Sequence, residues 1–201
     1  MQTAVHQVTR SIAYEEFLAV QELRALVAYT MAHQSDFKAS QVHDPDHVRD
    51  SYRRSRVLMD TDSFHELFRA RIAFYLNRIL RSLQRPYFDM TRMESQITAS
   101  NDGDYFRPHN DNTHANWPSR EITFVYFFHR EPRPFSGGEL LLYDFNRDGA
   151  TDLGPARKRI TPRQNSIIFF QSSTLHEILP VHCPTGRFED SRFTLNGWLH
   201  C

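Results

Sequence analysis

The change of pattern at Pro86 constrains the fold of this chain more than any other feature of its 201 residues. Before Pro86, two long segments carry apolar residues at helical spacing. After it, short runs rich in β-branched and aromatic residues are separated by turn signals. Two helices followed by many short strands predict a mainly β chain of the α+β class, an antiparallel barrel or double-sheet jelly roll buttressed by helices on one side.

The two predicted helices are amphipathic. The first covers residues 14–33, where no Gly or Pro interrupts the apolar stripe. The second covers residues 63–83, and Pro86 closes it. Ser63 and Glu66 have the spacing of a capping box, which predicts that this helix begins at Ser63.

Seven strands are predicted after Pro86, with turn signals at 101–103, 132–138, 147–149 and 184–186. They cover residues 93–98, 105–111, 122–128, 139–143, 166–171, 177–181 and 192–199. The sixteen phenylalanines of the chain are enough to fill the interior that these strands would enclose.

We expect one domain over residues 1–201, because a chain of this length is the size of one large β or α+β domain. Residues 1–86 would supply helical support and residues 87–201 the jelly-roll core. Residues 35–57, between the helices, are polar and lack periodicity, which predicts a long loop. Such loops are usually functional or disordered, so a lid over a site is one interpretation.

The segment His43-Asp44-Pro45-Asp46-His47 within this loop contains four side chains that can bind metal. Pro45 breaks any regular spacing between them, so we interpret the segment as a solvated loop.

Charge and cysteine content exclude several classes of function. Lys+Arg and Asp+Glu are equal at 24 each, so no net field attracts nucleic acid or an anionic membrane. Two cysteines, Cys183 and Cys201, are too few for a disulfide scaffold. No signal pattern or stretch of about 18 apolar residues is present. We expect a cytoplasmic protein without nucleic-acid or membrane partners, and the sequence makes no prediction of oligomeric state.

His109-Asn110-Asp111 predicts half of a metal site. Residues two apart in a strand point to the same face, so this spacing presents an imidazole and a carboxylate together. A facial iron site needs a second imidazole from a distant strand, and His176 suits that role. The motif alone is weak, since about one His-x-acid is expected by chance; a second, His129-Arg130-Glu131, precedes Pro132 and reads as a strand end.

A buried cation is the next requirement if the site takes a dicarboxylic co-substrate. Arginine suits because its fork pairs with both carboxylate oxygens and stays charged when desolvated. Arg192 begins the last predicted strand among apolar and aromatic residues. Arg187 is the rival, but it follows Gly186 and is more typical of a turn.

Several short motifs occur in a fixed order along the second half of the chain. They are Gly103-x-x-Phe106-x-x-His109-x-Asp111, Arg120-x-x-Thr123-x-x-Tyr126, Ser136-Gly137-Gly138-Glu139-Leu140, His176-Glu177-Ile178-x-Pro180-Val181, and then Arg192 and Trp198. In this order they resemble the catalytic core of the prolyl-4-hydroxylase-like branch of the Fe(II)/2-oxoglutarate oxygenases.

The resemblance implies a double-stranded β-helix with Fe(II) held by His109, Asp111 and His176. It also implies 2-oxoglutarate on the iron, with its far carboxylate on Arg192, together with O2 and ascorbate as an optional reductant. The products expected are hydroxylated substrate, succinate and CO2. Because Asp111 is a carboxylate, no ligand position is left for the halide of a halogenase.

Two tyrosines that relatives commonly direct at the co-substrate are replaced here. The first falls on Ala99 or Ser100, and the second on Phe127. The candidates to take over their hydrogen bonds are Ser100, Thr123, Tyr126, Tyr143 and Thr194.

We therefore expect a hydroxylase acting on an unactivated C–H bond of a small molecule or of a prolyl or peptidyl substrate. Desaturation or cyclisation in small-molecule biosynthesis is an alternative outcome. A non-catalytic, cupin-like metal-binding module is the alternative from another class, and it would not need Arg192. A zinc hydrolase also gives that arginine no role.

Overall fold

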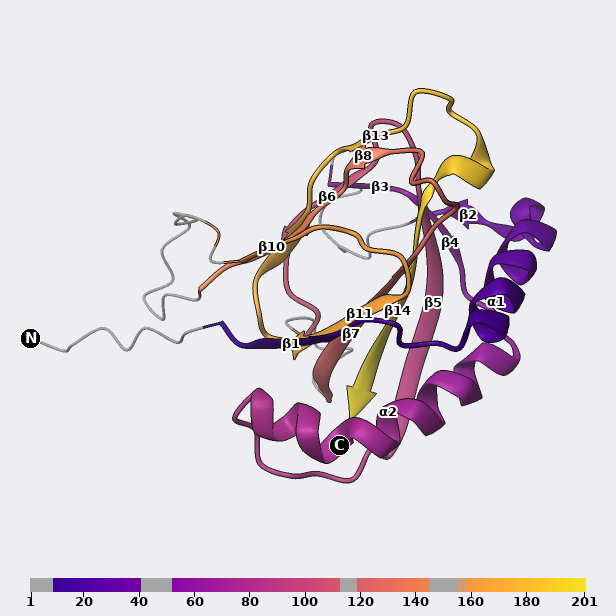
Figure 1. Cartoon of the computed structure of the whole chain (residues 1–201). Coiled ribbons are helices and arrows are strands. Elements are labelled where there is room, and N and C mark those ends of the chain that lie inside the picture. The colour runs from indigo at the N-terminus through magenta and orange to yellow at the C-terminus, as the bar shows by residue number, and fades with distance from the viewer. Residues whose placement is uncertain (1–8, 41–51, 113–118, 145–155, 157) are drawn as a thin grey trace, which may run out of the picture.

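The computed structural model describes residues 9–40, 52–112, 119–144, 156 and 158–201. Two antiparallel sheets face each other, and two helices cover the outer side of the larger one (Figure 1). This mainly β architecture with helices on one side is the one that the sequence predicted. No helix among the described residues is long and apolar enough to cross a membrane.

The larger sheet has seven strands in the order β1-β11-β7-β14-β5-β4-β2. Their bounds are β1 Ser11–Tyr14, β11 Ser166–Gln171, β7 Arg120–Phe128, β14 Arg192–His200, β5 Arg92–Ser100, β4 Arg56–Leu58 and β2 Lys38–Ala39.

The smaller sheet has five strands in the order β10-β9-β12-β6-β3, and β13 and β8 form a separate pair. Their bounds are β10 Lys158–Ile160, β9 Leu140–Leu142, β12 His176–Ile178, β6 Tyr105–His109, β3 Arg53–Arg54, β13 Val181–His182 and β8 Ser136–Gly137.

Strand β7 shows how the layers are held together. Alternate side chains of a strand point to opposite faces. Phe124, Tyr126 and Phe128 belong to the core that the larger sheet shares with the helices. Val125 and Phe127 belong to a second cluster with side chains of the smaller sheet. Both faces of β7 are therefore buried, and its middle residues are apolar throughout.

The helices are α1 Val20–Ala32 and α2 Ser63–Ser82, with short 3₁₀ turns at Gln34–Asp36 and Phe188–Asp190. The predicted start of the first helix at Tyr14 was wrong, because Tyr14 ends β1. Helix α1 begins after Ala19, whose backbone N–H donates to the Glu22 carboxylate at 2.7 Å.

The predicted capping box of the second helix was also wrong. Ser63 is already the first residue of α2, and the N-cap residue is Asp62, which makes no side-chain capping bond. The buried stripe of α2 is as expected, with Phe68, Ile72 and Ile79 completely buried against the larger sheet.

The first 86 residues contribute more than helical support. Strands β1, β2 and β4 extend the larger sheet and β3 extends the smaller one, so the expected division at residue 86 does not separate two parts of the fold. The predicted loop 35–57 has strands near both ends. Its middle, 41–51, lies outside the described residues. The segment 43–47 falls in this part, and so does the centre of the loop that was interpreted as a lid.

Candidate metal centre

Cross-strand pairing brings the two predicted histidines together. Strands β6 and β12 pair antiparallel with His109 directly opposite His176, and the centroids of their rings are 4.1 Å apart. Asp111 follows β6 by two residues, and its backbone N–H donates to the carbonyl oxygen of Ser172 at 2.9 Å. The carboxylate thereby turns back toward the two rings.

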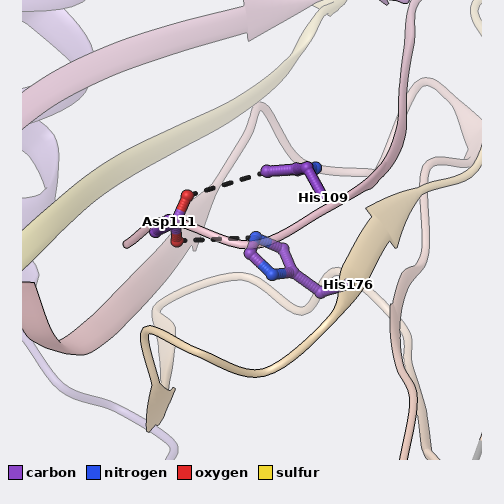
Figure 2. A group of neighbouring side chains, drawn as sticks. All are labelled: His109, Asp111 and His176. Carbon is purple, nitrogen blue, oxygen red and sulfur yellow. Dashed lines mark ion pairs between the residues drawn. The ribbon is translucent and has the colours of Figure 1, made fainter. Parts of the chain in front are cut away.

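The three side chains present one ligand atom each to a common point, and these atoms all lie within 4.8 Å of one another (Figure 2). The Nε2 atom of His109 is 3.8 Å from Asp111 Oδ1, and the Nε2 atom of His176 is 3.6 Å from Asp111 Oδ2. Metal–nitrogen and metal–oxygen bonds are ~2.1 Å long, so two ligands of one ion lie at most ~4.2 Å apart. Both distances leave room for one ion.

Backbone carbonyls fix the protonation pattern of both rings. The Nδ1 atom of His109 is 2.8 Å from the carbonyl oxygen of Arg107, and that of His176 is 2.9 Å from the carbonyl oxygen of Thr174. A carbonyl only accepts hydrogen bonds, so each Nδ1 carries the proton and each Nε2 keeps a lone pair. This is the arrangement that second-shell partners impose on metal-binding histidines.

The electrostatics also suit a cation. Burial, with a smaller contribution from nearby His176, lowers the pKa of His109 to about 3, so the ring is neutral at pH 7. Burial alone would raise the pKa of Asp111, but the two histidines and a 2.7 Å hydrogen bond from the Thr123 hydroxyl bring it below its usual value. The site therefore offers two imidazoles, that of His109 held neutral, and one carboxylate.

The three ligand candidates open into a pocket between the two sheets. Its walls combine polar side chains of β5 and β14 with apolar side chains of the smaller sheet. The lining residues used below are Arg53, Ser55, Ser100, Phe106, Thr123, Arg192, Thr194, Asn196 and Trp198.

The structure separates the two candidate arginines. Arg192 is 2% exposed, and its Nε donates to the carbonyl oxygen of Gly138 at 2.8 Å. Its Nη2 is buried with no hydrogen-bond partner among the described residues. The side chain of Arg187 is 63% exposed and lies 3.7 Å from Glu189. Only Arg192 faces the pocket, as the sequence predicted.

The candidate hydrogen-bonding residues divide into two groups. Ser100, Thr123 and Thr194 line the pocket. Tyr126 does not, and this prediction was wrong: its ring points into the core beneath the helices, and its hydroxyl donates to Asn165 at 2.8 Å. Tyr143 also lies away from the pocket lining, and its hydroxyl donates to the carboxylate of Glu177.

The second His-x-acid motif, His129-Arg130-Glu131, lies at the end of a strand, as expected. His129 follows the end of β7, and the peptide bond between Glu131 and Pro132 is cis. His129 packs at right angles to Phe135, with ring centroids 5.5 Å apart, and it joins no cluster of candidate metal ligands among the described residues.

Sequence reasoning missed Arg53, a cation in the wall of the same pocket. It lies on β3, inside the segment predicted to be a loop. The signal that could have found it is the alternation of Arg53-Arg54-Ser55-Arg56, in which the first and third residues line the pocket and the other two are exposed.

Comparisons with known proteins agree with this geometry. A family profile described as the 2OG-Fe(II) oxygenase superfamily matches residues 95–200. An uncharacterized PKHD-type hydroxylase of Synechocystis is 44% identical over 151 residues, which are 74% of this chain and 50% of that protein. The chain thus spans about half the length of this relative.

Solved structures show the same fold at low sequence identity. A prolyl-4-hydroxylase of Pseudomonas putida superposes with a TM-score of 0.67 at 20% identity, covering 96% of this chain and 94% of that one. A prolyl hydroxylase of Trichoplax adhaerens, solved with a peptide fragment of hypoxia inducible factor, has a TM-score of 0.64 at 13% identity, with coverage of 94% and 83%. These neighbours place the fold among the jelly-roll oxygenases.

Proposed function

The chain belongs to the 2OG-Fe(II) oxygenase superfamily, and from that premise we propose that it is an oxygenase that hydroxylates an unactivated C–H bond. The co-substrates would be 2-oxoglutarate and O2, with succinate and CO2 as the other products. The observation that carries this proposal is the group of His109, Asp111 and His176, with both Nδ1 atoms held by backbone carbonyls.

The donor set fits Fe(II). Two imidazoles and one carboxylate on one side of an ion form the facial triad of non-haem iron oxygenases, and they leave the other positions open. The Thr123 hydroxyl holds Asp111 Oδ2, which fixes the orientation of the carboxylate. Trp198 lines the pocket beside Asp111 and helps to lower its pKa.

The pocket also fits 2-oxoglutarate. The buried Nη2 of Arg192 lacks a partner among the described residues, and a carboxylate would satisfy it. Ser100 and Thr194 place hydroxyl groups in the same pocket. In this arrangement Arg192 would bind and orient the co-substrate, and the apolar wall would exclude water. Iron and the keto acid would supply the oxidising chemistry when bound.

The substrate proposed at this level is a small molecule or a prolyl or peptidyl group. Two of the structural neighbours are a prolyl-4-hydroxylase and a prolyl hydroxylase, and the second was solved with a peptide. A non-catalytic metal-binding module is the weaker reading, because it gives a buried arginine with an unpaired Nη2 no role.

Three ligand variants test the proposal. We expect His109→Ala, Asp111→Ala and His176→Ala each to abolish succinate release from 2-oxoglutarate while keeping the fold, because β6 and β12 pair through their backbones and not through these side chains. His129→Ala is the control and should keep most of the activity. Wild-type succinate release in any of the three ligand variants would refute the assignment.

A further inference from the structure

Arg53 lies close to the candidate metal ligands although it comes from the first half of the chain. It pairs with Phe106 across strands β3 and β6. Its guanidinium lies 4.8 Å from the centroid of the Phe106 ring. That ring in turn stacks on His109, with centroids 3.4 Å apart and an interplanar angle of 17°. The guanidinium is therefore one aromatic layer away from a candidate metal ligand.

The hydrogen bonds of Arg53 leave its end groups available. Its Nε donates to the Ser55 hydroxyl at 3.0 Å. Among the described residues, no carboxylate lies within ion-pair distance of its guanidinium, whereas neighbouring Arg54 pairs with Asp104 at 3.0 Å. Arg53 lines the pocket, and the fork of a guanidinium has the geometry that pairs with two carboxylate oxygens.

The protein environment does not favour this charge by itself. Burial lowers the pKa of Arg53 to about 10, and the more distant carboxylate of Asp111 offsets part of that effect. The group is still positively charged at pH 7. Arg53 is half-buried, and its close neighbours Phe106 and Ser55 carry no negative charge. A partly desolvated cation without an anion beside it is usually one that pairs with a ligand.

A count of charges shows what the ligand must supply. Under the proposed function, Fe(II) and Arg192 bring three positive charges to the pocket, and 2-oxoglutarate and Asp111 bring three negative charges. These cancel, since a histidine binds a metal as the neutral imidazole. Counted over the described residues, Arg53 adds one positive charge to this pocket that none of these groups balances.

We propose that Arg53 binds a carboxylate of the oxidised substrate, which makes that substrate a small carboxylic acid, such as a free amino acid, rather than a prolyl residue inside a protein chain. The inference rests on the proposed function and deepens it, because it names the substrate class. An internal prolyl residue has no carboxylate of its own, so it would leave Arg53 unpaired.

Binding to the Mn(II)- and 2-oxoglutarate-loaded protein under anaerobic conditions tests this without turnover. The probes are pairs that differ only in a carboxylate or a primary amide, namely L-proline and L-prolinamide, L-leucine and L-leucinamide, and benzoate and benzamide. The readouts are the dissociation constant, measured on the manganese form, and the NMR signal of the Arg53 Nε–H group, recorded on the protein loaded with diamagnetic Zn(II), because Mn(II) would broaden the signal of a group so near the metal. The variants are Arg53→Gln and, as the matched control, Arg54→Gln, which removes an exposed charge one residue away.

We expect at least one acid to bind tenfold or more tightly than its amide, and to shift the Arg53 signal. Arg53→Gln should reduce the preference to about threefold or less, and Arg54→Gln should preserve it. The proposal is overturned if amides bind as well as acids, or if no acid of the panel shifts the signal. It is also overturned if Arg53→Gln weakens 2-oxoglutarate binding as much as Arg192→Ala does, because Arg53 would then serve the co-substrate.

A separate measurement distinguishes failure of this inference from failure of the proposed function. If the Fe(II)-loaded wild-type protein releases no succinate from 2-oxoglutarate, the oxygenase proposal fails. The acid-to-amide preference is measured on the manganese form, so it still shows whether Arg53 binds a carboxylate.

Discussion

Replacing Arg192 by alanine is the sharpest test of how the pocket would hold 2-oxoglutarate. Arg192 is 2% exposed, and its buried Nη2 has no partner among the described residues. Removing one member of a buried ion pair costs about 3–5 kcal/mol, because the other charge stays desolvated. The expected loss of 2-oxoglutarate affinity is therefore roughly two to three orders of magnitude.

Two further variants serve as references for the loss expected in Arg192→Ala. Arg192→Lys should recover only part of the loss, since lysine keeps the charge but not the planar fork or the Nε bond to Gly138. Arg187→Ala removes an exposed arginine, whose pairing with Glu189 is worth only ~0–1 kcal/mol. The expected change in affinity is a few-fold at most.

The assay is titration of the manganese-loaded protein with 2-oxoglutarate without oxygen, for the wild type and the three variants. Thermal unfolding of each variant separates lost binding from lost structure. If Arg187→Ala were more damaging than Arg192→Ala, the co-substrate would not bind as described, and the roles of Thr194 and Trp198 on β14 would have to be reassigned as well.

Three further predictions use matched positions in the same fold. Tyr126→Phe should lower the free energy of unfolding by about 1 kcal/mol, because one hydrogen bond is lost, and should leave 2-oxoglutarate affinity unchanged. A loss of affinity as well would mean that Tyr126 contributes to the site. Gly138→Ala should weaken 2-oxoglutarate binding at least tenfold more than Gly186→Ala. Both glycines have positive φ, but an added Cβ meets the Arg192 side chain at 2.6 Å only at Gly138, so equal effects in titration would contradict this. Burial lowers the pKa of His129 below its unfolded value of about 6.5, so the stability that it contributes is present above that pH and is lost as the pH falls. Denaturant unfolding between pH 7 and 5 should show a steeper loss for the wild type than for His129→Gln, and parallel curves would rule this out.

The sequence predicted the strands that are long enough to carry a pattern. The predicted strand 166–171 coincides with β11, and 192–199 with all but the last residue of β14. Six of the described strands, each two to four residues long, were missed, because runs this short barely show a period. They are β1, β2, β3, β4, β8 and β10. Their existence depends on partners far away in the sequence, such as Phe106 for Arg53.

Residues of the candidate site could be predicted from the sequence where local strand geometry fixes the face to which a side chain points. His109 and Asp111 are two residues apart, so local geometry puts them on one face. Tyr126 was assigned to the wrong face because β7 is buried on both sides. The run from Phe124 to Phe128 is apolar or aromatic at every position, so it does not reveal which side chains point to which face. Arg192 could be chosen over Arg187 because only one of them begins a strand with an apolar pattern.

The candidate site is built from two parts of the chain, and only one of them matches the superfamily profile. The three candidate metal ligands and Arg192 all lie within residues 95–200, the part that matches the superfamily profile. Arg53 lies outside that part, on a strand that joins the smaller sheet beside β6. The groups proposed for the shared chemistry therefore lie in the matched core, while a group proposed for substrate choice comes from the first half of the chain, outside that core. A relative that shares only the core should share the co-substrate without sharing the substrate, since Arg53 can change without disturbing any proposed ligand of the iron.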